Sequence, residues 1–210
     1  MADKYRDIEF QSDSELYILC WLFELKDKGY VEKIIRAPEL IIAEGISGEF
    51  SKLKQYKTKA GQMKGKYEQK SQTILPAHHY TAEFVIKWPE VLHPGLVWHL
   101  RNVSQSKNYA PLIAQDIGQD KDISFVEVKP DFDRHNMIRT FMVNQGWVWQ
   151  SRRIYINLLQ PMKLFKRTFT PREYLVSRVK RTERRLDWEA RTVEEWLSMI
   201  NDKYQKGEYL

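Results

Sequence analysis

The sequence predicts an α/β fold, because strand-like and helix-like segments alternate along its second half. Residues 123–129 and the later segment RRIYINLL have the pattern of strands, and DRHNMIRTFMVNQG lies between them as a helix. A strand, a helix and a strand in succession favour a parallel strand pair joined by a right-handed crossover. The 210 residues suffice for one core with an appendage, and we expect a core over residues 1–170 and a C-terminal helical arm over residues 171–210.

The first predicted element is a helix over residues 13–28. Ser12 and Glu15 have the spacing of a capping box, apolar residues then recur at helical spacing, and Gly29 supplies a stop. The segment VEKIIRAPELIIAE follows as strand material, in which Pro38 marks an edge, a bulge or a break between two short strands.

Residues 44–73 are rich in lysine and glycine and contain few large apolar side chains. This composition predicts a mobile basic loop or a loose hairpin. A solvated surface loop and a clamp on nucleic acid both fit the pattern. The lysines that a clamp would use are Lys52, Lys54, Lys57, Lys59, Lys64 and Lys66.

Two predicted strands carry carboxylates among apolar residues. In HHYTAEFVIKW the side chains alternate as in a strand, with Glu83 among apolar neighbours. In FVEVKPD, Glu127 and Lys129 are two residues apart and therefore share one face of a strand. Residues 88–121, between these strands, are poorly periodic, and we interpret them as an insertion.

The segments after FVEVKPD are expected to be mainly helical. The next helix should begin at Asp131 or Asp133 and end at Gly146, and the chain from Pro171 onward is charged. Helical spacing would place several basic residues of the arm on related faces. A phosphate-binding ridge and a solvated, salt-bridged face are both consistent with these residues, which are Arg178, Lys180, Arg181, Arg184 and Arg185.

The amino-acid composition indicates what kind of partner the protein binds and in which compartment it works. A formal charge of +6 and a pI near 9.2 favour a polyanionic partner, although many basic proteins bind no nucleic acid. The single Cys20 excludes an intrachain disulfide and a cysteine-based zinc cluster. The sequence shows no secretory signal and no apolar run of about 18 residues, so we expect a cytoplasmic protein without a membrane span.

Buried acids in apolar strands indicate a need for a compensating charge. An ionised Glu83 or Glu127 is costly there unless a metal ion, a cation or a proton relieves the cost. Oxygen ligands favour Mg²⁺, for which Mn²⁺ can substitute. Lys129 adds an ammonium group that can orient water or offset charge on a phosphate. Taken alone, however, the triplet is better explained as an ordinary salt bridge between Glu127 and Lys129.

The order of these residues resembles that of the PD-(D/E)xK nuclease superfamily. A helix with Glu15, a strand with Glu83, a strand with Glu127 and Lys129, and a following helix and strand carry the resemblance over residues 10–160. The helix glutamate is most similar to that of phage endonucleases, Holliday-junction resolvases and TnsA-type transposon endonucleases. The pattern departs from the superfamily in two ways, since Glu83 stands where aspartate is usual and a long insertion precedes Glu127.

The resemblance implies a restriction-endonuclease-like core, in which helices flank a central mixed β-sheet, and a magnesium-dependent deoxyribonuclease. The protein would hydrolyse phosphodiester bonds of DNA in phage or mobile-element recombination, replication or DNA processing. Glu83, Glu127 and Glu15 would then hold the metal, with Lys129 as the catalytic lysine. The position of Glu15 three residues after Ser12 has a second explanation, which is a capping box at the start of the helix.

The same resemblance suggests partners and a setting. Coordinated cleavage of two strands requires two active sites, so we expect a homodimer, together with recombination or replication partner proteins. A phage-encoded enzyme would act in the cytoplasm of its bacterial host. The alternatives are a non-catalytic DNA-binding subunit of a recombination or transposition complex, and a virion or assembly protein in which the acid and lysine form only a salt bridge.

Overall fold

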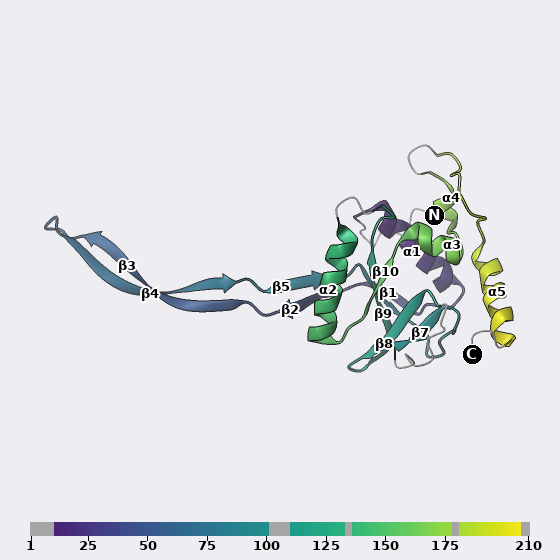
Figure 1. The fold of residues 1–210 in the computed structure, drawn as a ribbon, viewed down its shortest axis with the longest axis horizontal. Helices are drawn as coiled ribbons and strands as arrows, with labels where there is room; N and C mark the ends of the chain where they lie inside the picture. Colours follow the sequence, from purple (N-terminus) through teal and green to yellow (C-terminus); the bar gives the residue numbers. More distant parts are fainter. Residues whose placement is uncertain (1–10, 101–109, 133–135, 178–180, 207–210) are drawn as a thin grey trace. The chain divides into compact units, whose positions relative to one another are not determined.

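The computed structural model describes residues 11–100, 110–132, 136–177 and 181–206 (Figure 1). The chain divides into two compact units. One unit contains Met1–Pro38 and Thr81–Leu210, and the other contains Glu39–Tyr80. The fold is mixed α/β, which confirms the predicted class at this level. None of the described helices is long and apolar enough to cross a membrane.

The first unit is built on a six-stranded mixed sheet. The first, sixth, ninth and eighth strands pair antiparallel in that order, and parallel pairs attach the seventh strand to the eighth and the tenth to the ninth. The strands are β1 (Lys33–Arg36), β6 (Phe84–Lys87), β7 (Val97–His99), β8 (Leu112–Ile117), β9 (Asp120–Val128) and β10 (Ile156–Leu159).

Helix α1 (Asp13–Asp27) forms the centre of the core, and its bounds confirm the predicted helix. Ile18, Leu19 and Trp21 are fully buried in a cluster that also contains Val126 and Val128 of β9. The alternation of β9 therefore directs these two valines toward the α1 side and turns the intervening Glu127 to the opposite face.

The predicted strand, helix and strand of the second half are also present. Helix α2 (Met137–Arg152) connects β9 to β10, which pair in parallel with Ile156 opposite Phe125. We expected this helix to end at Gly146, but it continues for six residues to Arg152. Burial of Val148 stabilises the turn beyond the glycine, and the helix ends where Arg153 adopts a left-handed φ of 58°.

Asp131 does not begin α2 as the sequence suggested. Its carboxylate accepts hydrogen bonds from the backbone N–H of Met162, at 3.0 and 3.2 Å, at the start of helix α3 (Pro161–Arg167). The alternative start, Asp133, lies outside the described residues. The last residue of FVEVKPD thus caps a different helix from the one that follows it in sequence.

The chain after Pro171 forms two helices separated by an irregular segment. Helix α4 (Arg172–Leu175) is short, and α5 (Val193–Gln205) begins with a capping box between Thr192 and Glu195. Trp196 and Ile200 of α5 belong to the same buried cluster as α1. The described residues of this segment belong to the first unit.

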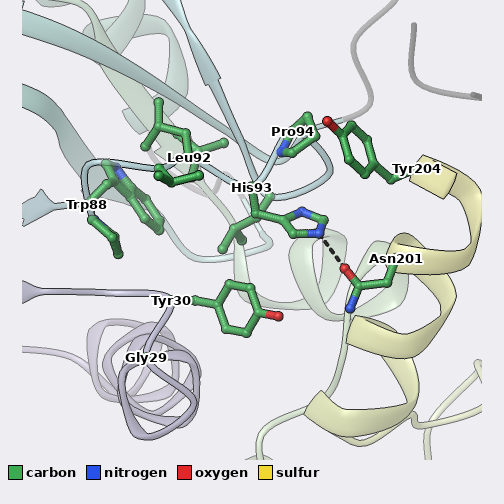
Figure 2. Close-up of a pocket in the computed structure, with 12 residues that line it drawn as sticks. Gly29, Tyr30, Trp88, Leu92, His93, Pro94, Asn201 and Tyr204 are labelled. Atoms are coloured by element: carbon green, nitrogen blue, oxygen red, sulfur yellow. Dashed lines mark hydrogen bonds between the residues drawn. The ribbon is translucent and has the colours of Figure 1, made fainter.

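The predicted insertion, residues 88–121, supplies β7 and β8 and one wall of a pocket of about 380 Å³. The other walls come from the end of α1 and from α5 (Figure 2). His93 points from the insertion toward α5, where its Nε2 hydrogen-bonds Oδ1 of Asn201 at 2.7 Å. Its Nδ1 accepts the backbone N–H of Gly95 at 3.1 Å, so Nε2 is the nitrogen that donates.

Replacing Asn201 with alanine should lower the free energy of unfolding by about 1 kcal/mol, because the half-buried His93 N–H would lose its acceptor. Chemical denaturation followed by far-UV circular dichroism measures this loss. Asp202→Ala, at the exposed neighbouring position of α5, is the control and should change stability by less than about 0.5 kcal/mol. Equal stability of both variants and the parent would contradict the role of this hydrogen bond.

The second unit consists of two pairs of strands. Strand β2 (Glu39–Ala43) pairs with β5 (His78–Thr81), and β3 (Ile46–Lys57) pairs antiparallel with β4 (Met63–Leu75). Of the two predictions for residues 44–73, the structure therefore contains the hairpin. The expected break at Pro38 is also confirmed, since it separates β1 from β2.

Candidate active site

Two carboxylates of the first unit lie close together where β6 begins beside the end of β9. Glu83 precedes β6, so the single strand predicted over HHYTAEFVIKW is divided into β5 and β6. Phe84 of β6 pairs with Val126 of β9, and the backbone N–H of Glu83 also donates to the Val126 carbonyl, at 2.9 Å. Glu83 is thereby brought near Glu127, whose charge raises the pKa of Glu83, and the two like charges require a compensating charge.

Lys129 supplies one such charge. Its ammonium group contacts Oε1 of Glu127, and the side chains of both residues are largely buried. The backbone N–H of Lys129 donates to the carbonyl of Leu159 at 3.0 Å, which ties the residue after β9 to the end of β10. The shared face that the sequence predicted for Glu127 and Lys129 is thus present, and the two groups form an ion pair.

Arg36, at the end of β1, supplies the second charge. Its guanidinium lies 3.0 Å from Oε2 of Glu83 and 3.5 Å from Oε2 of Glu15, and it stacks 5.1 Å from the centroid of the Phe84 ring. Sequence reasoning missed Arg36, because a single basic residue at a strand end has no distinctive pattern. The pairing of β1 with β6, which sets Arg36 opposite Phe84, brings it to the site.

Glu15 makes the helix-start contacts that its spacing from Ser12 predicted, and it also faces Arg36. Its carboxylate accepts hydrogen bonds from the backbone N–H of Gln11 and from the hydroxyl of Ser12, both at 2.9 Å, and its own N–H donates to the Ser12 Oγ at 3.2 Å. The helix start therefore fixes a buried carboxylate that also faces Arg36. The structure brings Glu15 to the border of the site through this arginine.

The electrostatics of the site favour an added cation. Burial first, and then the charges of Glu15 and Glu127, raise the pKa of Glu83 to about 7 against the opposing effect of Arg36 and Lys129. Three carboxylates thus face two cationic side chains in a partly buried place. The oxygen-only donor set fits Mg²⁺ or Mn²⁺, and a divalent ion would relieve the repulsion that holds a proton on Glu83.

A second cluster of metal-ligating side chains lies at the other end of β9. His99 Nε2 is 3.1 Å from Oδ1 of Asp116 and 3.6 Å from Oδ1 of Asp122. Asp122 has a left-handed φ of 52°, and its buried Oδ1 has no hydrogen-bond partner among the residues that the structure describes. These three residues can hold a metal ion, although none of them was a candidate from the sequence. They come together only through the pairing of β7, β8 and β9.

The basic residues predicted to bind DNA fall into three groups. The lysines of residues 44–73 are exposed on the hairpin or at its turn. Arg184 instead packs between Tyr17 and Tyr174, with its guanidinium 5.0 and 4.6 Å from the ring centroids, and donates to the Tyr17 hydroxyl at 2.6 Å. Arg184 is therefore a packing residue. Arg181 and Arg185 are exposed in an irregular segment, and two further candidates lie outside the described residues, Arg178 and Lys180.

Comparisons of this chain with protein-family models, with curated proteins and with solved structures find no match. The functional assignment consequently rests on the site itself. That site combines Glu83, which immediately precedes β6, and Glu127 of β9 with the Glu127–Lys129 ion pair and with Arg36, which joins Glu83 to Glu15.

Proposed function

We propose that this protein is a metal-dependent DNA endonuclease with a restriction-endonuclease-like core of the PD-(D/E)xK type. The observation that supports it most strongly is the closeness of Glu83 to Glu127, with Lys129 paired to Glu127. Sheet folding alone does not require two neighbouring carboxylates, and their repulsion is a cost that a divalent cation offsets. The proposed setting is phage or mobile-element DNA recombination, replication or processing.

Glu83 and Glu127 are the residues that would hold Mg²⁺ or Mn²⁺, with Glu15 beside them. When bound, the ion lowers the pKa of water and offsets negative charge on the scissile phosphate. Glu127 also holds the Lys129 ammonium in place. Lys129 would donate to a phosphate oxygen or to the attacking water, where a fixed positive charge is most useful as negative charge develops.

Arg36 has a separate role in this proposal. It neutralises Glu83 and Glu15 together, so it keeps two carboxylates close to each other while the site binds no other cation. An entering divalent ion would compete with the guanidinium for Glu83. Arg36 is therefore a positioning residue whose contact with Glu83 should weaken when metal binds.

A second candidate function is a DNA-binding subunit that does no hydrolysis, and one observation favours it. Each carboxylate of the site already has a cationic or capping partner within the chain, Arg36 for Glu83, Lys129 for Glu127 and the α1 start for Glu15. Such a subunit would bind DNA equally well with and without Glu127 or Lys129, and metal would produce no cleavage.

Purified protein should cleave DNA in the presence of Mg²⁺ or Mn²⁺ and leave it intact in EDTA. The substrates are duplex, branched and single-stranded DNA, because the site does not specify one of them. Glu127→Gln should lower the rate by about 10²–10³-fold, since it removes both a ligand and the anchor of Lys129. Gel analysis of labelled substrates measures the products.

Asp116→Asn is the matched control, because it alters the second carboxylate cluster by the same chemistry. It should leave the cleavage rate within a few-fold of the parent. If no substrate is cut with either metal, the nuclease proposal fails. If Asp116→Asn abolishes cleavage and Glu127→Gln does not, the metal belongs to the cluster of His99, Asp116 and Asp122.

A further inference from the structure

The hairpin of β3 and β4 has two chemically different faces. Residues directly opposite in an antiparallel pair share a face, and successive residues alternate between faces. The register runs without interruption from Ser47 opposite Thr73 to Lys57 opposite Met63. We define the basic face by Phe50, Lys52, Lys54, Tyr56, Lys64, Lys66, Glu68 and Lys70, and the neutral face by Glu49, Ser51, Leu53, Gln55, Lys57, Met63, Tyr67 and Gln69.

Charge is distributed very unequally between these faces. The basic face carries five lysines and one glutamate, whereas the neutral face carries one lysine and one glutamate. The lysines of the basic face are all exposed. The alternation of charge along both strands thus concentrates positive potential on one side of the ribbon.

The charges of the basic face destabilise the hairpin. Lys54 and Lys66 are directly opposite each other, an arrangement of like charges that destabilises strand pairing. The contact of Lys54 with Glu68, at 3.5 Å, offsets part of this repulsion. A two-stranded ribbon is only marginally stable in water, so a cluster of five lysines with one glutamate is better explained by an anionic partner than by folding.

Exposed aromatic side chains accompany the lysines. Phe50 lies opposite Lys70 and Tyr56 lies opposite Lys64, and each aromatic residue is 47% exposed. Aromatic rings beside ammonium groups suit a partner that presents phosphates together with apolar groups, such as the thymine methyls in the major groove of DNA. A purely anionic surface would make no use of the rings.

We propose that the basic face of this ribbon binds duplex DNA by entering the major groove, where its lysines contact the phosphates on both sides. The major groove is about 12 Å wide and admits a two-stranded β-ribbon. A strand of 12 residues is about 40 Å long at roughly 3.3 Å per residue, which exceeds one helical turn of about 34 Å. The deep, narrow major groove of duplex RNA would exclude the ribbon.

This inference rests on the proposed function, from which it takes DNA as the polyanionic partner. It also divides the lysines that the sequence grouped together between the two faces and the turn. Lys57 belongs to the neutral face, and Lys59 lies in the turn between Thr58 and Gln62. Lys70, absent from the predicted set, belongs to the basic face. Contacts to phosphates carry no sequence information, so binding through this face is expected to be largely independent of sequence.

Two double variants of the full-length protein, equal in net charge, test the proposal. Lys54→Gln with Lys66→Gln removes two charges from the basic face, and Gln55→Glu with Gln69→Glu removes the same net charge on the neutral face. Fluorescence anisotropy with a labelled 30-base-pair DNA duplex, in EDTA, gives the affinity at several salt concentrations. The basic-face variant should bind about tenfold or more weakly and lose about two from the salt slope.

The neutral-face variant should keep the salt slope and lose less than about threefold in affinity. Removing the opposed lysines relieves repulsion, so the basic-face variant should fold at least as well as the parent, which circular dichroism verifies. Equal losses in the two variants would mean that overall charge, and not this face, attracts DNA. Preference of the parent for an RNA duplex or for single-stranded DNA of the same sequence would overturn the major-groove assignment.

The binding assay is independent of catalysis because EDTA prevents any metal-dependent cleavage. If no DNA is cut but the two double variants still differ in DNA affinity, the nuclease proposal fails and the assignment of the basic face stands. If DNA is cut but the two variants bind it equally well, the nuclease proposal stands and the assignment of the basic face fails. The two proposals therefore fail separately.

Discussion

Lys129→Ala is expected to lower metal-dependent DNA cleavage by about 10²–10⁴-fold while leaving Mn²⁺ binding at least as tight as in the parent. The ammonium contacts Glu127 and lies near enough to Glu83 to lower its pKa, so its loss removes positive charge from the reacting region. The same loss makes the carboxylate site more negative, which favours a divalent cation. Titration of Mn²⁺ by electron paramagnetic resonance, beside single-turnover cleavage, separates the two effects.

Two controls sharpen this prediction. Lys33→Ala changes an exposed lysine on β1 of the same sheet and should leave the cleavage rate within about twofold of the parent. Lys129→Arg keeps the charge in a larger group and should recover part of the activity. The assignment of Lys129 would be refuted by a variant that cuts at the parental rate, or by one whose loss of activity follows entirely from lost Mn²⁺ binding.

The affinity for Mn²⁺ should fall steeply as the pH is lowered below about 7. The pKa of Glu83 is raised to about 7 by burial first, and then by the neighbouring charges of Glu15 and Glu127. Below that pH a metal ion must displace a proton from Glu83, so the affinity should fall by an amount that approaches tenfold per pH unit, about 50-fold between pH 7 and pH 5. Isothermal titration calorimetry across this range measures the change and the released proton.

The free energy of unfolding of the metal-free protein, by contrast, should rise as the pH is lowered. Because the pKa of Glu83 is higher in the folded chain than its ordinary value of 4.5, the folded state retains a proton that the unfolded state releases. The stabilisation from this proton is fully present below pH 4.5 and is lost as the pH rises through about 7. Chemical denaturation in EDTA at several pH values measures this change in the free energy of unfolding.

Glu83→Gln is the control for both effects, since its amide cannot titrate. It should flatten this part of the stability profile and weaken Mn²⁺ binding at every pH. A parental slope that persists in the variant between pH 5 and pH 7 would show that another group is responsible. In that case the raised pKa of Glu83 would not describe the protein in solution.

The elements with regular periodicity were predictable from the sequence. Helix α1 has a capping box and apolar residues at helical spacing, and β9 alternates without interruption over FVEV. Composition alone could not decide between a loop and the hairpin of β3 and β4, because lysine and glycine suit both. The prediction that α2 ends at Gly146 was wrong, because a helix can continue through a glycine when the residues beyond it pack into the core. Val148 is buried in this way.

The candidate site was predictable only in part, for a physical reason. Glu127 and Lys129 are neighbours within one strand, so geometry alone placed them together. Arg36 reaches Glu83 through the register of β1 against β6, and His99 meets Asp116 through the pairing of β7 with β8. Such contacts depend on which strands pair and in what register, and no local pattern in one sequence records that choice.

The pairing of β1 with β6 has a consequence for how the protein can vary. These strands are antiparallel neighbours, and the whole second unit, Glu39–Tyr80, is inserted between them. A connection between adjacent antiparallel strands needs only a tight turn, and lengthening it costs little in loop entropy. The hairpin can therefore lengthen, shorten or change its charge while the register of β6 against β9, which brings Glu83 near Glu127, stays the same.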